Sequence, residues 1–288
     1  MIPRGKLLLI GGKENKEDEN EEMKRKNKNF CPNEILQLLA DSKNDRIEVI
    51  TTASSDPDSI EKMYTEAFGK IGYSDFGFLD ICDEQIHTDY HIKRISAAKT
   101  IFFAGGDQNR ICDVLKQSAL KSLIKEKYRN EEGFILAGTS AGAMCIPGIV
   151  ILEAENGEAI LENDISLDSG WGFIDNCIVD THFIHRARFG RLAHAVILNR
   201  DCWGIGLGED TALLVEEGYI GICKGSGMAW LINAEDIGQT NIETVKKGCP
   251  VFAENLKVHI LTDNCKINLR ENIFSGQPGN KNNTAAEK

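Results

Sequence analysis

Residues 134–144 read FILAGTSAGAM, and this stretch decides the fold of the chain. Its first four residues form an apolar run of strand length, and the small and apolar residues after Ser140 are typical of a helix start. A Gly-x-Ser-x-Gly pattern between a strand and a helix is the sequence form of a nucleophile elbow. The turn is sharp and strained, so the flanking Gly138 and Gly142 have to be small. The alternative is an ordinary glycine-rich turn, and residues elsewhere in the chain have to decide between the two.

The chain before this stretch alternates apolar runs with segments of helical spacing. We expect helices at 59–71, 92–98 and 111–123, and strands at 7–10, 46–53, 76–79, 100–104 and 134–137. This alternation predicts an α/β fold with a mostly parallel sheet and helices on both faces. Sites in such sheets form at the carboxyl ends of the strands. Gly11-Gly12, Gly105-Gly106 and Ser140 all follow expected strands, so the pattern predicts a site where they meet.

The second half is denser in strands and has no linker or repeat, so we expect one α/β domain over residues 1–274. Residues 13–30 are nearly all charged or Asn at their start and cannot bury an apolar face. They are therefore expected to form an exposed charged insertion. Residues 275–288 are polar and rich in Gly and Asn, and we expect a disordered tail.

The composition excludes several classes of protein. The net charge of −11 over 288 residues argues against nucleic acid or an anionic membrane as the main partner. No apolar run approaches the roughly 20 residues of a membrane span, and the amino-terminal apolar run is too short for a signal peptide. We therefore expect a cytoplasmic protein. The nine cysteines lack metal-site spacing, so we expect them reduced and mostly buried, with no metal and no cofactor.

A nucleophilic serine needs a base within hydrogen-bond reach. His182 directly follows the apolar strand ending at Asp180, which puts it at a carboxyl end, and His185 is its nearest competitor. The remaining histidines are expected to be structural, with two facing solvent, one inside a helix and one packed in a late strand: His87, His91, His194 and His259. His182 is therefore the candidate base.

The third member of such a site is an acid that orients the base. Glu209 lies between the expected strands 203–207 and 211–215, in a glycine-flanked turn that would hold a carboxylate against an imidazole. The alternative is a plain hairpin turn, where acidic residues are common. Glu153 and Glu155, shortly after the serine, are the other candidate acids.

Three arginines follow His182 within nine residues: Arg186, Arg188 and Arg191. In an acidic protein they would clamp a substrate carboxylate, although a solvated helix start with salt bridges is the alternative. The Ala141 amide and an amide of the Gly105-Gly106 turn, assigned here to Gly106, would hold an oxyanion. Gln108 would be a polar contact to the substrate. Nucleophile, base, acid, oxyanion donors and anion clamp are then all present.

Four motifs with these residues resemble the cyanophycinase and peptidase E family of serine peptidases. They are GGDQ at 105–108, GTSAGA at 138–143, DTHF at 180–183 with its arginines, and GIGLGEDTA at 204–212. The resemblance implies a fold like that of class I glutamine amidotransferases and a triad of Ser140, His182 and Glu209. It also implies substrate contacts from Gln108, Asp180 and the arginines, and a homodimer.

The resemblance further implies an exopeptidase that hydrolyses aspartyl peptide bonds, such as the poly-aspartate backbone of cyanophycin, to give β-Asp-Arg dipeptides. One residue departs from the family pattern, because Thr181 stands where cyanophycinases have a substrate-contacting glutamine. Thr181 therefore leaves the substrate open. The alternatives are an aspartyl dipeptidase of the peptidase E type and a non-catalytic peptide-binding homologue. An amidotransferase-like transferase is disfavoured because the turn carries serine in place of the more nucleophilic cysteine.

Overall fold

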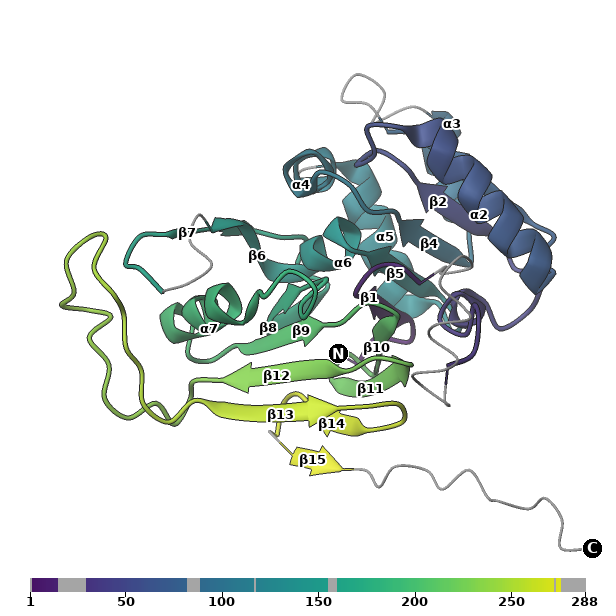
Figure 1. Ribbon diagram of the computed structural model, residues 1–288. Helices are drawn as coiled ribbons and strands as arrows, with labels where there is room; N and C mark the ends of the chain where they lie inside the picture. The colour runs from purple at the N-terminus through teal and green to yellow at the C-terminus, as the bar shows by residue number, and fades with distance from the viewer. Residues whose placement is uncertain are drawn as a thin grey trace, which may run out of the picture.

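The computed structural model describes residues 2–14, 30–81, 89–116, 118–154, 160–271 and 273–275 (Figure 1). Most of the predicted charged insertion, 15–29, lies outside these residues. Ser275 ends the last strand, and the rest of the predicted tail, 276–288, also lies outside them.

The first sheet has nine strands in the order β15-β14-β11-β10-β1-β5-β4-β2-β3. Strands β1, β5, β4, β2 and β3 are parallel, and the others join them in antiparallel pairs. The bounds are β1 (Lys6–Ile10), β2 (Ile47–Ile50), β3 (Phe76–Leu79), β4 (Thr100–Phe103), β5 (Ile135–Thr139), β10 (Thr211–Glu216), β11 (Ile220–Gly225), β14 (Lys266–Asn268) and β15 (Ile273–Ser275).

The second sheet has six strands in the order β13-β12-β9-β8-β6-β7. Its parallel pairs are β6 with β8 and β8 with β9, and the other pairs are antiparallel. The bounds are β6 (Pro147–Ala154), β7 (Ile165–Ser169), β8 (Ile174–Asp180), β9 (Trp203–Leu207), β12 (Ala229–Asn233) and β13 (Lys257–Leu261).

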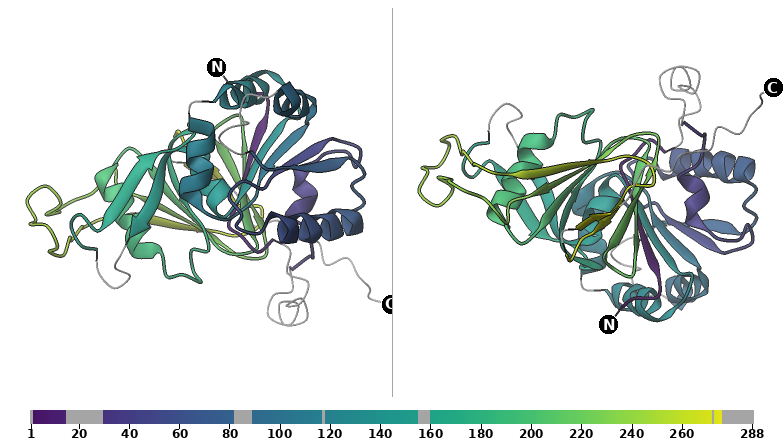
Figure 2. Two further views of the ribbon diagram at one scale, coloured as in Figure 1. Left: turned by 90° about the horizontal axis from the view of Figure 1, so that it is seen from above. Right: turned by 90° about the horizontal axis from the view of Figure 1, so that it is seen from below.

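Helices cover both faces of the parallel strands, because successive side chains of a strand point to opposite faces. Leu7 and Leu9 of β1 pack in a core with α3, α4 and α5, whereas Leu8 and Ile10 pack in another with α2 and η1. Figure 2 shows the strands between these layers. The bounds are η1 (Leu36–Leu39), α2 (Pro57–Ile71), α3 (Asp89–Ala97), α4 (Gln108–Lys116), α5 (Ala119–Asn130), α6 (Ala141–Cys145) and α7 (Phe189–Leu198).

The prediction of a mostly parallel sheet is wrong, because both sheets are mixed. The extra strands come from the second half of the chain, where the connections are short. Residues 217–219 alone join β10 to β11, and a parallel pair needs a crossover of about a dozen residues or more. The hairpin interpretation of the Glu209 turn is also wrong, because β9 and β10 belong to different sheets.

Two smaller expectations also fail. The predicted helix 111–123 is two helices, because the Ser118 side chain caps α5 by accepting from the Lys121 N–H. His91 is buried and not solvent-facing, since it shares the inner face of α3 with Ile95, one turn later. His87 lies outside the described residues. Among the described helices, none is long and apolar enough to cross a membrane.

Candidate active site

Ser140 lies between the end of β5 and the start of α6, as the sequence pattern predicts. Its backbone has φ 51° and ψ −119°, a conformation that L-residues rarely adopt. Glycine is required on both sides. A Cβ on Gly138 would lie 2.5 Å from the Gly142 carbonyl carbon, and one on Gly142 would lie 2.4 Å from the Phe103 carbonyl oxygen. The turn therefore fits only with glycine two residues before and two after the serine.

The structure brings the serine, histidine and acid of the predicted triad together. Ser140 Oγ lies 3.1 Å from His182 Nε2, and His182 Nδ1 lies 3.0 Å from Glu209 Oε1. His182 follows β8, and Glu209 lies between β9 and β10. Both side chains are buried, whereas Ser140 is partly exposed. This is the spacing of a nucleophile, a general base and an orienting carboxylate.

Three successive carbonyl groups at the end of β1 hold these residues in place. The carbonyl of Ile10 accepts from Ser140 N–H at 3.0 Å, that of Gly11 from His182 N–H at 2.9 Å, and that of Gly12 from Asp210 N–H at 3.0 Å. One segment of chain thus fixes the backbone at the serine, at the histidine and beside the acid. Sequence reasoning placed Gly11-Gly12 at a strand end but gave the pair no role.

The glycine pair is also required by close packing. A Cβ on Gly11 would lie 1.9 Å from the Gly208 carbonyl oxygen, and one on Gly12 would lie 2.4 Å from His182 Cε1. Gly12 has φ 105°, which favours glycine in any case. The Gly-Gly signal was present in the sequence, but only the structure shows that the histidine ring lies against it.

Glu209 has basic neighbours on both carboxylate oxygens. Oε1 faces His182, while Oε2 lies 3.2 Å from His185 Nε2 and 3.4 Å from Lys13 Nζ. His185, the competitor for the role of base, therefore contacts the acid and not the serine. Of the alternative acids, Glu153 lies on β6 and lines a pocket with Asn163, Asp164 and Lys247, and Glu155 lies outside the described residues.

Burial lowers the pKa of His182, and the hydrogen bond that His182 donates to Glu209 opposes this effect. The charges of Arg186 and Arg188 lower the pKa further. A lowered pKa keeps the imidazole neutral near neutral pH, which is the form that accepts a proton from serine.

The Gly105-Gly106 turn lies against the serine. A Cβ on Gly105 would be 3.1 Å from Ser140 Cβ, and Gly106 has φ 147° with Ala53 O pressed against it. Ala141 begins α6, where the first N–H groups of a helix have no helical acceptor. Amides of both segments are thus close to Ser140, although their role as oxyanion donors stays a prediction.

Asp180 is fully buried and is held by two arginines. Its carboxylate accepts from Arg188 at 2.9 Å and from Arg191 through two nitrogens, one of them Nε at 2.6 Å. Burial lowers the pKa of Arg188 to about 10. The guanidinium groups of Arg188 and Arg191 are therefore engaged inside the protein. Their assignment, with Asp180, to the substrate stays a prediction.

Arg186 differs from its two neighbours because it is exposed, and its charge lowers the His182 pKa more than that of Arg188 does. Thr181 is fully buried, and its Oγ1 has no hydrogen-bond partner among the described residues. Gln108 is the first residue of α4, and its side chain lies outside the described part of the structure. Of the predicted substrate contacts, Arg186 is the one whose charged group is exposed beside the triad.

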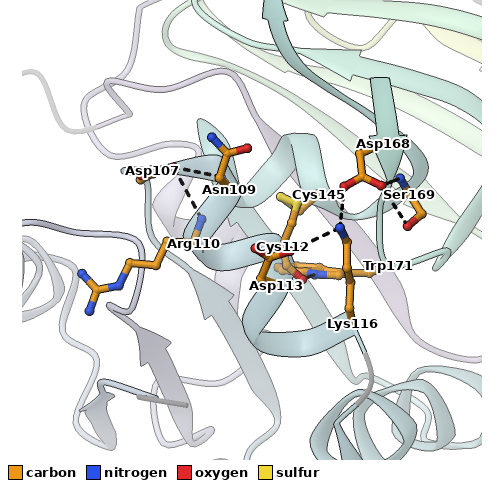
Figure 3. The surroundings of a disulfide bond; sticks show 10 residues. All are labelled: Asp107, Asn109, Arg110, Cys112, Asp113, Lys116, Cys145, Asp168, Ser169 and Trp171. Carbon is orange, nitrogen blue, oxygen red and sulfur yellow. Dashed lines mark hydrogen bonds and ion pairs between the residues drawn. A yellow bond between two sulfur atoms is a disulfide. The ribbon is translucent and has the colours of Figure 1, made fainter. Parts of the chain in front are cut away.

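The prediction of reduced cysteines is wrong for one pair. Figure 3 shows a disulfide between Cys112 of α4 and Cys145 of α6, with Cα atoms 5.8 Å apart. The pair is 33 residues apart in sequence, so only the packing of the two helices reveals it. The bond joins the helix after the Gly105-Gly106 turn to the helix after Ser140. Among the described free cysteines, Cys31 and Cys249 are exposed and the others are buried.

The expectation that 13–30 is exposed is wrong at Glu14, which is buried. Its carboxylate accepts from Tyr64 Oη at 2.6 Å and from Thr139 Oγ1 at 2.9 Å. The composition of the segment predicts a polar, exposed chain. Glu14, however, lies only four residues after the end of β1, and its side chain reaches the interior. Within the described residues, no group of three or more His, Cys, Asp or Glu is arranged to hold a metal ion.

Contact between a serine, a histidine and a carboxylate is an arrangement that hydrolases of several different folds share. The chain matches Peptidase family S51 over residues 7–223 and belongs to that family. It is 31% identical over 261 residues to the cyanophycinase of Trichormus variabilis, covering 89% of this chain and 83% of the relative. It is also 31% identical to the cyanophycinase of Geminocystis herdmanii, covering 90% and 91%.

A solved structure supports the fold. The crystal structure of a peptidase from an acI-B1 Actinobacterium aligns with a TM-score of 0.59 and 22% identity, covering 92% of this chain and 97% of that one. The predicted family resemblance is confirmed, and the chain is a hydrolase of the peptidase class.

Proposed function

We propose that the chain is a serine-type peptidase that hydrolyses aspartyl peptide bonds through an acyl-enzyme on Ser140. The observation that carries the proposal is the contact series from Ser140 Oγ to His182 at 3.1 Å and from His182 to Glu209 at 3.0 Å. The turn at Ser140 would be a nucleophile elbow in a fold of the class I glutamine amidotransferase type.

In the first step, Ser140 Oγ attacks the scissile carbonyl carbon while its proton passes to His182 Nε2. Glu209 holds the imidazole in the correct tautomer and stabilises the imidazolium. Amides of Ala141 and Gly106 would stabilise the oxyanion. The C–N bond then breaks, His182 returns the proton to the leaving amine, and the acyl group stays on Ser140.

In the second step, His182 takes a proton from water, and the hydroxide oxygen attacks the acyl carbon. The ester bond breaks, Ser140 recovers its proton, and the new carboxylate leaves. The exposed Arg186 would bind an aspartyl carboxylate of the substrate. The substrate we propose is the poly-aspartate backbone of cyanophycin, released as β-Asp-Arg dipeptides, with a cytoplasmic homodimer as the working form.

The test is product analysis of the purified protein on cyanophycin and on amino-terminal aspartyl dipeptides. Release of β-Asp-Arg from the polymer supports the proposal, whereas cleavage of the short dipeptides alone assigns an aspartyl dipeptidase. Ser140→Ala should lower kcat by about 10⁴-fold or more without loss of folding. If a fluorophosphonate probe fails to label Ser140, the chain is a non-catalytic homologue.

A further inference from the structure

We propose that Glu14 is a positioning residue that holds Ser140 in its strained backbone conformation through Thr139. This inference rests on the proposed role of Ser140 as the nucleophile. Glu14 lies outside the triad, and none of the chemical steps above requires it. Its carboxylate is nevertheless buried one residue away from the serine, against the side chain of Thr139.

The environment of Glu14 is costly for a carboxylate. Its two hydrogen-bond donors are hydroxyl groups, and no Lys, Arg or His forms an ion pair with Glu14 among the described residues. Burying a carboxylate costs free energy unless hydrogen bonds or a nearby charge compensate it, and the described donors here are two neutral hydroxyl groups. Burial at this cost is a reason to look for a role in the site.

The two oxygens of Glu14 connect two parts of the molecule. Oε1 accepts from Tyr64 of α2, and Oε2 accepts from Thr139, the last residue of β5. Tyr64 is buried, and burial together with Glu14 raises the pKa of its hydroxyl well above its ordinary value. The tyrosine therefore stays a neutral donor. Glu14 is thus fixed from the α2 side and reaches the strand that carries the nucleophile.

The effect on Ser140 follows from the backbone. A non-glycine residue at φ 51° and ψ −119° persists only when its surroundings hold it there. The Ile10 carbonyl holds the Ser140 N–H from one side. The Thr139 hydroxyl donates to Glu14, and this hydrogen bond restricts the residue that directly precedes Ser140. The same short segment of chain therefore contacts the serine turn twice.

The neighbours of Glu14 indicate a shared task. Gly12 lies against the His182 ring, and Lys13 lies 3.4 Å from Glu209 Oε2. Residues 12, 13 and 14 consequently contact the base, the acid and the strand of the nucleophile in turn. Gly12 and Lys13 lie in the turn that follows β1. Glu14 comes directly after them and adds the side-chain contact with Thr139.

The test uses the full chain with Glu14→Gln and Thr139→Val, separately and together. Glu14→Gln keeps the shape and removes the charge, and Thr139→Val keeps the shape and removes the hydroxyl. We expect either change to lower kcat and the rate of Ser140 labelling by a fluorophosphonate about 10- to 100-fold, with little change in KM. The double variant should lose no more than the larger single loss, since both changes act on the same hydrogen bond.

Tyr73→Phe is the matched control. Its hydroxyl is donated to the carbonyls of Leu36 and Gln37, away from the triad, so its removal costs a buried hydrogen bond and leaves kcat unchanged. Wild-type labelling rates in Glu14→Gln, or fully multiplicative losses in the double variant, would overturn the proposal. If the wild type itself is not labelled, the proposed function fails, and this inference fails with it.

Discussion

Two buried carboxylates flank His182, one held by arginines and the other by histidines. Asp180 accepts from Arg188 and Arg191, whose guanidinium groups stay charged. Glu209 faces His182 and His185, and its second oxygen also lies 3.4 Å from Lys13 Nζ. The first carboxylate is held by two arginine charges. The second faces the proposed base, which would gain and lose a proton in each catalytic cycle.

The largest effect should come from breaking the second pair. Glu209→Gln keeps the shape but removes the charge that stabilises the imidazolium. We expect kcat to fall by about 10³- to 10⁴-fold, with only a small change in the free energy of unfolding. Steady-state kinetics and urea unfolding of the same preparation measure both. A loss of less than tenfold in kcat would remove Glu209 from the triad.

Breaking the first pair should give the opposite result. Asp180→Asn leaves two mostly buried arginines without their counter-charge, so we expect a loss of about 3 kcal/mol in the free energy of unfolding. The folded fraction should keep kcat within about tenfold of wild type. If stability is unchanged and KM on aspartyl peptides rises, Asp180 is instead the substrate contact that the sequence predicted.

The segment 10–12, which contacts the backbone beside the serine, the histidine and the acid, can be tested at Gly12. Gly12→Ala would place a Cβ 2.4 Å from His182 Cε1, so the ring has to move. We expect kcat to fall about 100-fold, because a shift of about 1 Å in a catalytic group costs that much. Gly72→Ala is the control, since Gly72 has φ 88° with open space around it. Gly72→Ala carries the positive-φ strain without the clash, so it should lose less stability than Gly12→Ala and keep full kcat.

The sequence predicted the parts of the site that follow local rules. Ser140, His182 and Glu209 each follow an apolar run, and strand ends are where such folds place their sites. What failed depended on contacts between distant segments. The pairing of Cys112 with Cys145 comes from the packing of two helices, and the burial of Glu14 comes from α2 and β5.

The arginines illustrate the same limit. Their number and spacing indicate an anion site, and the alternative from the sequence is a solvated helix start with salt bridges. Only the fold shows that Arg188 and Arg191 turn inward to Asp180 while Arg186 stays exposed. A charge pattern in the sequence does not reveal which carboxylate, internal or external, is the partner.

The smallest expected effect is a shift of the pH profile. Burial and Arg186 lower the pKa of His182 below its ordinary 6.5, so the acid limb of kcat/KM should lie below pH 6.5. Protonation on that limb removes the neutral base, and activity should therefore rise with pH. Arg186→Gln removes a nearby positive charge and should raise the His182 pKa, which moves the limb up by roughly a few tenths of a pH unit.

The measured quantity is the pH at the midpoint of the acid limb. The maximum of kcat/KM is not used, because Arg186 is also a proposed substrate contact. Lys62→Gln, an exposed change on α2, should leave the limb in place. The shift should shrink at 1 M salt, where charges more than about 3 Å apart are screened. A limb that moves to lower pH in Arg186→Gln would show that the charge beside His182 acts with the opposite sign.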